Sequence, residues 1–409
     1  MLEANVMSDW PEQRSTATRS SLPDLTKRAE ALQSLLRKNA ADSDKNRRAS
    51  EENIQAIAEA GLFRLMVPKR YGGHEGTLRS HLEVSAALAE ACGGTAWVTA
   101  LTNVCAWFTS LFPKRAQDEI FGANPDARVS GVFTPSKQSR RVDGGLVISG
   151  KWYFSSGSLH ADWAMVGVIE HDENGALKNQ FLALVPMQEV SIEDTWYTAG
   201  MRASGSNCIV GNEVFVPDHR LMDLGAVLRG EYPTEFKNEA SYRATFMPLA
   251  HLVLIGPQLG MGRAALKYVI EKAPQRGIAY TSFEKQIDST VFQTQIADAA
   301  LKIDTAHLIA FSAADRIDDA ARRNEQLDQL TRARVKAETG LIVTYITDAL
   351  NILLSAHGAG SFTEASPMQQ WWRDSNTAAR HAAVGLPALG MEIYGKALLG
   401  VENTVSKMV

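Results

Sequence analysis

The spacing of apolar residues changes twice along the chain, and these two changes restrict the fold more than any other feature. The first part has the periodicity of amphipathic helices, the middle part has short runs rich in β-branched and aromatic residues, and the last part is helical again. This order is typical of a mostly helical α+β protein. We therefore predict an N-terminal helical domain, a central β domain and a C-terminal helical domain over residues 22–126, 127–235 and 236–409.

The N-terminal domain contains clear helix signals. Ser50 is followed by Glu51 and Glu52, which indicates an N-cap with acidic residues in the first turn, where the helix dipole favours negative charge. Gly61 is expected to end this helix. Residues 84–91 and 95–111 are apolar or small on nearly all faces, and this pattern predicts two buried helices.

The central domain is predicted from short runs that are separated by turn residues such as Asp143-Gly144-Gly145 and Asn174-Gly175. Strands at this spacing are typical of an antiparallel barrel or sandwich. The predicted strands are Arg128–Thr134, Leu146–Phe154, Trp163–Glu170, Phe181–Val185 and Cys208–Val216.

The C-terminal domain shows long helical patterns with brief breaks, one of them at Gly358-Ala359-Gly360-Ser361. Helices in series joined by short connections predict an up-and-down four-helix bundle. The predicted helices are Ala250–Lys272, Glu284–Ala320, Gln326–Leu354 and Trp371–Leu398.

Two stretches of this bundle carry apolar or small residues on more than one face. They are Ala250–Gly262 and Ala382–Leu399. A surface helix of a monomer normally has one apolar stripe, so the extra faces are expected to be covered by other subunits. Closed symmetry then favours a homotetramer built as a dimer of dimers.

The composition excludes several classes of protein. The 409 residues carry 42 basic and 46 acidic side chains, so no basic surface for nucleic acid is expected. No apolar run approaches the ~18 residues of a membrane helix, and the polar N-terminus lacks the apolar segment of a secretion signal. The first ~20 residues are expected to be loosely ordered. We expect a cytoplasmic enzyme that does not bind membranes.

Short motifs exclude further chemistry. The three cysteines, Cys92, Cys105 and Cys208, lie far apart, and no HExxH pair occurs, so neither a disulfide framework nor a metal site is predicted. The sequence has no GxxxxGK[ST] loop and no GxSxG motif, and Gly260-Met261-Gly262 lies inside a helical pattern. These absences exclude Rossmann, kinase-like and serine hydrolase mechanisms.

Four groups of short motifs follow one another along the chain. They are Gly61-Leu62-Phe63 with Val67-Pro68 and Tyr71-Gly72-Gly73, Gly150–Gly157 with His160–Trp163, Gly200–Ser206 with Val214–Pro217, and Trp372-Arg373-Asp374. In this order they resemble the acyl-CoA dehydrogenase fold over about Leu25 to Gly400. This resemblance implies an N-terminal helical domain, a central antiparallel β-barrel and a C-terminal four-helix bundle.

Within this fold, the sequence resembles the flavin monooxygenases more than the dehydrogenases. Dehydrogenases commonly place a catalytic Glu in a Tyr-Glu-Gly-Thr stretch, whereas this chain has Met391-Glu392-Ile393-Tyr394-Gly395. The run from Trp372 to His381 and the segment Phe154–Trp163 resemble hydroxylases of phenols, indoles, polyketides and dibenzothiophene.

This resemblance implies the oxygenase component of a two-component monooxygenase. Such a component takes reduced FAD or FMN, with FADH2 favoured, from a separate flavin reductase and uses O2 to form a C4a-hydroperoxyflavin. The expected substrate is a small aromatic or indole-like compound. One alternative is an acyl-CoA dehydrogenase or related flavin oxidase with Glu338 or Asp374 as its acid, and another is a flavin-free relative without catalysis.

The candidate catalytic residues follow from the need to exclude water and to hold the peroxide by hydrogen bonds. The resemblance implies Ser156 near flavin N5, with Ser155 as the alternative because neighbouring strand residues face opposite sides. His381, expected to titrate near neutrality, is the candidate for proton transfer. Asn103 is expected to donate to the peroxide, and His160 is a further candidate. The alternatives are a strand-end serine and histidines without a catalytic role.

Flavin binding requires aromatic contacts, hydrogen-bond donors for the ring system and cations or hydroxyls for the phosphates. Trp152 and Phe154 alternate with Ser155, so both are expected on one face, with barrel core as the alternative. Arg276 and Ser282 are expected to reach the flavin of a neighbouring subunit. The predicted flavin-binding residues are Phe133, Thr134, Trp152, Phe154, Ser155, Ser156, Arg263, Arg276 and Ser282.

A flat substrate pocket is expected to be lined by aromatic side chains, with ordinary core packing as the alternative. The candidates for this lining are Trp97, Trp107, Phe108, Trp196 and Tyr197.

Overall fold

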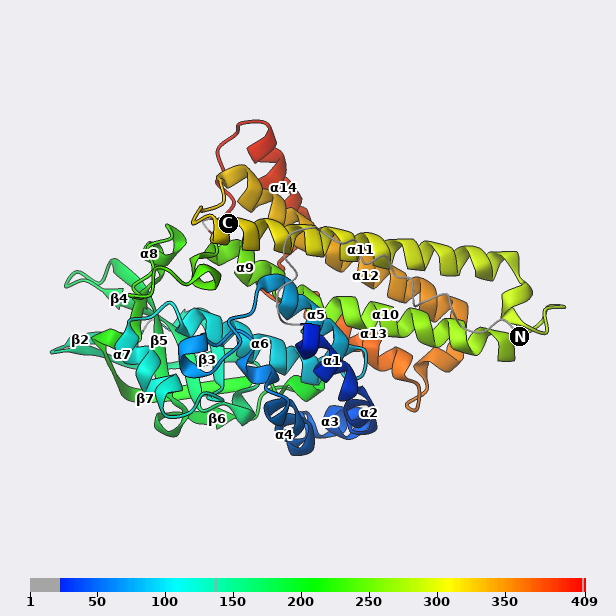
Figure 1. The fold of residues 1–409 in the computed structure, drawn as a ribbon, viewed down its shortest axis with the longest axis horizontal. Coiled ribbons are helices and arrows are strands. Elements are labelled where there is room, and N and C mark those ends of the chain that lie inside the picture. Colours follow the sequence, from blue (N-terminus) through cyan, green and yellow to red (C-terminus); the bar gives the residue numbers. More distant parts are fainter. Residues whose placement is uncertain (1–22, 137, 407) are drawn as a thin grey trace.

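The computed structural model places the β domain at one end of an elongated molecule and the long C-terminal helices at the other, with the N-terminal helices packed across the middle (Figure 1). The structure describes residues 23–136, 138–406 and 408–409. The expected loose order of the N-terminal segment lies outside these residues.

The N-terminal domain is helical, as predicted. Ser50 accepts a hydrogen bond from the backbone N–H of Asn53 and caps α4, and Gly61 follows that helix with a φ of +72°. The two helices expected to be buried, α5 and α6, are buried along most of their length. The helices are α1 (Pro23–Ala31), α2 (Gln33–Lys38), α3 (Ala40–Asn46), α4 (Glu51–Glu59), α5 (Leu78–Ala89), α6 (Gly93–Thr109) and α7 (Lys114–Gln117).

The central domain contains two four-stranded sheets, with strand orders β1-β4-β5-β8 and β2-β3-β7-β6. Apolar side chains from both sheets pack into one core, and the five predicted strands are confirmed. The short strands β2, β6 and β8 were not predicted. The strands are β1 (Val129–Ser136), β2 (Gln138–Val142), β3 (Gly145–Ser155), β4 (Trp163–His171), β5 (Leu177–Pro186), β6 (Ser191–Glu193), β7 (Asn207–Pro217) and β8 (Leu221–Asp223).

One strand pair departs from the expected antiparallel arrangement. β1 and β4 pair in parallel, with Val129 opposite Trp163 and Val132 opposite Val166. Between them the chain forms β2 and β3, which belong to the other sheet, so it returns to β1 in the same direction. The prediction of a purely antiparallel domain is therefore wrong at this pair.

The C-terminal domain contains three long helices, α10, α11 and α12, where long helices were predicted. The fourth predicted helix is wrong as a single element, because Gly385, with a φ of +67°, and Pro387 separate α13 from α14. The short helix α8 (Leu224–Leu228) lies within the range predicted for the central domain. The helices of the C-terminal domain are α9 (Phe246–Leu252), α10 (Ile255–Lys272), α11 (Thr290–Arg322), α12 (Gln329–His357), α13 (Pro367–Ala378) and α14 (Pro387–Leu398).

The helix α12 is the most apolar of the long helices. Among the described residues it is the one helix whose length and composition would suit a membrane span, and half of that stretch is buried inside the molecule. Such burial is typical of a core helix in a bundle.

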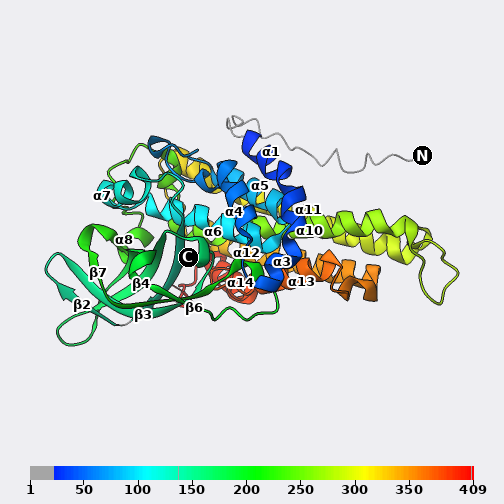
Figure 2. The ribbon, with the colours of Figure 1, turned by 90° about the horizontal axis from the view of Figure 1, so that it is seen from below.

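The helix α6 lies at the junction of the three domains, between the sheets and the bundle (Figure 2). It contacts β1, α10 and α13. Gly94 allows a close approach at this junction, because a Cβ atom there would lie 2.7 Å from the Cβ of Ala203. Side chains of α6 can therefore meet residues from both neighbouring domains.

Candidate functional site

The two neighbouring serines at the end of β3 point in different directions, as expected for a strand. Ser155 is fully buried, and its Oγ lies 2.6 Å from the Oγ of Ser130. Ser156 instead faces α6, where its Oγ accepts a hydrogen bond of 3.1 Å from the indole Nε1 of Trp97. Ser156 is therefore the serine that is directed toward the junction of the domains.

His381 lies beside the same tryptophan. It is in the turn between α13 and α14, rather than inside a helix, and its ring is 5.6 Å from that of Trp97 in an edge-to-face arrangement. Trp97 thus contacts Ser156 of the β domain and His381 of the C-terminal domain. Three segments that are distant in the sequence meet at this indole.

The surroundings of His381 define its protonation state. The backbone N–H of Ala383 donates to Nδ1 at 3.2 Å, so the neutral ring carries its hydrogen on Nε2. Burial, and then the charge of Lys336, lowers the pKa of His381 to about 4. The expectation that His381 titrates near neutrality is therefore wrong. At pH 7 it is a neutral imidazole that donates from Nε2.

A lysine of α12 holds the turn that carries His381. Lys336 donates from Nζ to the backbone carbonyls of Ala383 and Val384, the latter at 3.3 Å. Burial lowers the pKa of Lys336 to about 8, so it is still largely cationic at pH 7. Its charge further disfavours the imidazolium form of His381.

A second histidine near this turn, His251 of α9, was missed by the sequence reasoning. It is only 2% exposed, and neither ring nitrogen forms a hydrogen bond within the described part of the chain. Burial lowers the pKa of His251 well below its usual value, and the charges of Lys336 and His381 add to this effect. A histidine inside an apolar helical run was the one available signal, and it is a weak one.

The other two sequence candidates for the chemistry have different surroundings. Asn103 donates both amide hydrogens to backbone carbonyls, those of Leu62 at 2.8 Å and Thr99 at 2.9 Å, so it has no donor left for a peroxide. His160 faces the N-terminal helices, with Nδ1 3.4 Å from a carboxylate oxygen of Glu51. The structure brings neither residue into the cluster around Trp97.

The two acids considered for a dehydrogenase are both engaged elsewhere. Asp374 is 1% exposed and accepts a hydrogen bond of 2.5 Å from the backbone N–H of Met201, and burial raises its pKa to about 7. Glu338 pairs with Arg334 at 2.8 Å and with Arg316. Each of these carboxylates holds parts of the fold together.

Comparisons with known proteins show to which family the chain belongs. Residues 26–121 match the family model of the acyl-CoA dehydrogenase N-terminal domain, and residues 252–385 match that of the acyl-CoA dehydrogenase C-terminal domain. The oxygenase subunit HsaA of a flavin-dependent monooxygenase from Mycobacterium tuberculosis is 31% identical over 88% of this chain and 89% of its own. The chain belongs to the flavin-dependent monooxygenases with the acyl-CoA dehydrogenase fold.

Two further members of this monooxygenase family are similar along most of their length. The oxygenase component of an FADH2-dependent resorcinol hydroxylase from a Rhizobium species is 27% identical over 92% of this chain and 94% of its own. The solved structure of XiaF from a Streptomyces species, in complex with FADH2 and glycerol, superposes with a TM-score of 0.89. It is 34% identical and covers 94% of this chain and 96% of its own.

The predicted ring-binding residues of this monooxygenase fall into two groups. Phe133 and Thr134 form an irregularity in β1, because the pairing with β4 shifts between Val132 and Pro135. The ring of Phe133 packs against Phe108 at 4.9 Å, and Thr134 is exposed. These two residues thus have no partner in the neighbouring strand.

The other predicted pair, Trp152 and Phe154, does not share a face. Trp152 is 1% exposed, lies in the core between the sheets and donates from Nε1 to the Gly167 carbonyl at 2.9 Å. Phe154 is 62% exposed and contacts Trp196. The register of β3 against β7 shifts between Trp152 and Ser155, and this shift breaks the regular alternation.

The predicted phosphate-binding residues lie away from Trp97. Arg263 pairs at 2.7 Å with Glu90, the residue that follows α5, and Ser282 is exposed in the connection between α10 and α11. Arg276 donates to the backbone carbonyl of His357 at 3.0 Å, and its Nε is buried with no hydrogen-bond partner in the part of the chain that the structure describes. A Cβ atom on Gly360 would lie 3.4 Å from this guanidinium group.

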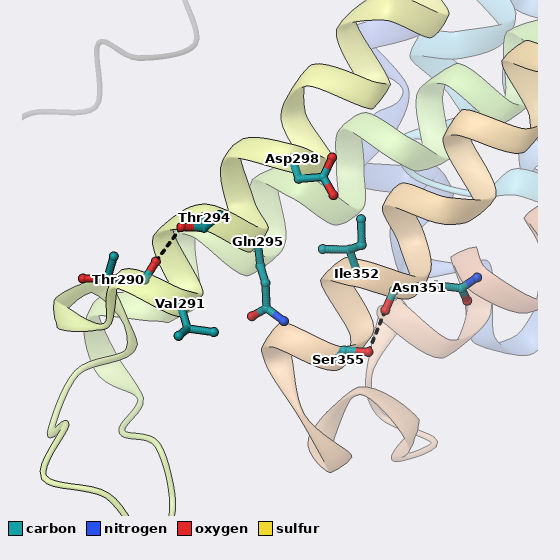
Figure 3. A pocket seen from close by; sticks show the side chains of 8 residues that line it. All are labelled: Thr290, Val291, Thr294, Gln295, Asp298, Asn351, Ile352 and Ser355. Carbon is teal, nitrogen blue, oxygen red and sulfur yellow. Dashed lines mark hydrogen bonds between the residues drawn. The ribbon is translucent and has the colours of Figure 1, made fainter.

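A groove opens between α11 and α12 at the same end of the bundle (Figure 3). Val291 and Gln295 line one side, and Asn351 and Ser355 line the other. This end of the bundle points away from the sheets (Figure 1). The groove is therefore remote from the cluster around Trp97.

The remaining aromatic candidates are divided between core and surface. Trp107 and Phe108 are buried in the main core, which favours ordinary packing for both. Tyr197 is 69% exposed and lies under the guanidinium of Arg47. Trp97 is the aromatic candidate that contacts Ser156 and His381.

Proposed function

We propose that this flavin-dependent monooxygenase is the oxygenase component of a two-component system and hydroxylates a small aromatic or indole-like compound. It receives reduced flavin from a separate flavin reductase. FADH2 is favoured over FMNH2, because the resorcinol hydroxylase is named as FADH2-dependent and the XiaF structure contains FADH2.

The observation that carries this proposal is the cluster in which Trp97 joins Ser156 to His381. The cluster lies at the junction of the domains and combines a hydroxyl group with a neutral imidazole. Family membership supplies the flavin chemistry, and the two acids expected of a dehydrogenase are engaged in structural contacts. These observations together favour oxygenation over dehydrogenation.

The residues of the chain fit a bound flavin. Ser156 faces the domain junction, the unpaired segment Phe133–Thr134 offers backbone groups, and Arg276 has a buried Nε without a partner. Once bound, the reduced flavin supplies the electrons that activate O2. In this proposal Ser156 contacts the ring of one flavin, and Arg276 binds the phosphates of the flavin held by a neighbouring subunit.

The histidines divide the proton transfers between them. His381 donates a hydrogen bond from Nε2 toward the activated oxygen, because its Nδ1 is already bound to Ala383. His251 has no hydrogen-bond partner among the described residues and is neutral at pH 7, so one of its ring nitrogens is open to accept a hydrogen bond from a phenol O–H or an indole N–H. This assignment separates the donor from the acceptor.

The protein is further proposed to be a homotetramer. Large apolar side chains remain exposed around α14, including Leu389 at 42%, Leu398 at 58% and Leu399 at 80%. The other stretch used in the sequence argument, Ala250–Gly262, is covered within the chain and supports no interface. Light scattering is expected to give about four times 44.6 kDa.

Product formation tests the proposed function directly. The protein is mixed with photoreduced FAD and ¹⁸O2, together with a panel of phenols, indoles and polycyclic aromatics, and products are identified by mass spectrometry. Incorporation of one labelled oxygen atom is the expected result. Anaerobic oxidation of an acyl-CoA by the flavin-loaded protein, with no oxygenated product, would overturn the proposal in favour of a dehydrogenase.

A further inference from the structure

A chain of three buried hydroxyl groups begins at Ser156. The Oγ atoms of Ser156 and Ser206 are 2.7 Å apart, and those of Ser206 and Ser204 are also 2.7 Å apart. Ser204 then donates to the backbone carbonyl of Met201 at 2.7 Å. At the other end, Trp97 donates to Ser156. The hydroxyl groups are thus linked between an indole N–H and a carbonyl oxygen.

With Ser204 donating to the Met201 carbonyl, the two ends of this row of hydroxyl groups set the direction of every hydrogen bond in it. An indole N–H only donates, a carbonyl oxygen only accepts, and a serine hydroxyl has one hydrogen. Since Ser204 uses its hydrogen on the Met201 carbonyl, Ser206 must donate to Ser204. Ser156 must then donate to Ser206. Ser156 is left with an unshared lone pair and with no free hydrogen.

We propose that Ser204 and Ser206 make the protein selective for the reduced state of its flavin. The proposal rests on the proposed function, in which Ser156 contacts the flavin ring, and it takes N5 as the atom contacted. N5 of a reduced flavin carries a hydrogen and donates, whereas N5 of an oxidised flavin accepts. Held as an acceptor, Ser156 matches the reduced flavin and presents a lone pair to the oxidised one. Ser204 and Ser206 act through Ser156 and are positioning residues.

The three hydroxyl groups can also form their hydrogen bonds in the opposite direction, so the selectivity for reduced over oxidised flavin is expected to be moderate. If all three hydroxyl groups turned, Ser156 would direct its hydrogen outward and Ser204 would lose its bond to Met201. The Met201 carbonyl would still accept from Trp196 Nε1 at 2.8 Å, so it would not be left without a partner. One net hydrogen bond corresponds to a factor of about three to ten in affinity.

The test compares the affinities of the full-length protein for oxidised and for reduced FAD. Oxidised FAD is titrated by its fluorescence, and reduced FAD is titrated under anaerobic conditions. Ser206→Ala removes the acceptor of the Ser156 hydrogen. Ser204→Ala removes the acceptor of the Ser206 hydrogen, so Ser206 can turn and donate to Ser156, which also leaves the Ser156 hydrogen free. Each variant is therefore expected to bind oxidised FAD about three to ten times more tightly. Affinity for reduced FAD is expected to change little. Ser206→Thr, which keeps a hydroxyl group, is expected to retain the parent ratio.

A matched control variant separates an effect of these hydroxyl groups from a general effect of removing a buried serine. Ser158→Ala removes a nearby buried serine that takes no part in the hydrogen bonds linking Ser156, Ser206 and Ser204. Its affinities for oxidised and for reduced FAD should both stay at the parent values. The proposal is overturned if Ser206→Ala and Ser204→Ala bind oxidised FAD as weakly as the parent, or weaken both redox states equally. Where one of these variants fails to fold, the other decides between these results.

Ser156→Ala separates failure of this inference from failure of the proposed site. If Ser156 contacts the flavin, its removal weakens binding of at least one redox state, reduced FAD if Ser156 accepts a hydrogen bond from N5 and oxidised FAD if it donates one. Unchanged affinities for both redox states in Ser156→Ala would remove Ser156 from the flavin site and would overturn the proposed function at that contact.

Discussion

The region around Trp97 and the far end of the helical bundle are built in different ways, although both are proposed to contact a flavin. Around Trp97, Ser156 and its neighbouring hydroxyl groups are buried and joined by hydrogen bonds within the chain. At the bundle end, Ser282 is exposed and the side chain of Arg276 is bound to His357 at the end of α12. The first region is complete in one chain, whereas the second presents a groove and unpaired donors.

This difference indicates how the two regions would depend on assembly. The chemistry near Trp97 requires fixed donors and acceptors in a dry environment, and the fold supplies these by joining three segments at α6. Phosphate recognition at the bundle end is expected to depend on a neighbouring subunit. Variants in the first region should therefore change oxygenation, and variants in the second should change flavin affinity.

The largest effect is expected for His381→Ala. Loss of the Nε2 donor beside Trp97 should lower product formation by about 10²-fold or more, while the affinity for reduced flavin changes little. Product and hydrogen peroxide are measured together for each reduced flavin consumed, and peroxide should replace product. His171→Ala, at the end of β4 and outside the cluster, serves as the control. Parent-like yields in His381→Ala would exclude His381 from the chemistry.

The second prediction concerns Lys336→Met and the pH dependence of oxygenation. The charge of Lys336 helps to lower the pKa of His381 to about 4, so the neutral ring is present above that pH and is lost below it. Removing the charge should raise this pKa and shift the acidic limb of the activity profile upward by about one pH unit. Lys336→Arg keeps the charge and should keep the profile of the parent. Identical profiles for all three proteins would show that Lys336 does not tune His381.

Much of the fold could be predicted because its signals are local. The strands, the Ser50 cap and the turn at Gly61 each depend on residues that are close together in the sequence, and the structure contains each of them. The parallel pairing of β1 with β4 has no local signal, because it depends on which sheet the intervening strands join. Likewise, the apolar faces of Ala250–Gly262 are covered by neighbouring helices, which periodicity alone cannot reveal.

The candidate site was predictable only in part. Ser156 and His381 were found through the resemblance to a family, and the structure places both beside Trp97. The charge state of His381 was predicted wrongly, because it depends on burial and then on Lys336, which lies 45 residues earlier in the sequence. His251 was missed for the same reason, since the protonation state and possible role of a histidine on an apolar helix depend on the groups packed around it.

At the bundle end, Arg276→Gln is expected to weaken the binding of reduced FAD by about tenfold, because hydrogen bonds to a charged group are the stronger kind. The ratio of product to hydrogen peroxide at saturating flavin should stay at the parent value. Arg263→Gln is the matched control, since Arg263 is paired with Glu90. A changed ratio with unchanged affinity would reverse the assignment of the two regions.

The smallest effect is expected for Trp97→Phe, which keeps an aromatic ring against His381 but removes the N–H that donates to Ser156. Loss of one neutral hydrogen bond should weaken the binding of reduced FAD by about fivefold. Trp107→Phe is a close match, because Trp107 also donates from Nε1, to the Ser241 carbonyl at 2.7 Å, but lies in the core. Both variants should lose a similar amount of thermal stability, and only Trp97→Phe should alter flavin affinity. Equal flavin affinities in the two variants would mean that the indole of Trp97 acts through packing, and that its hydrogen bond to Ser156 has no part in the site.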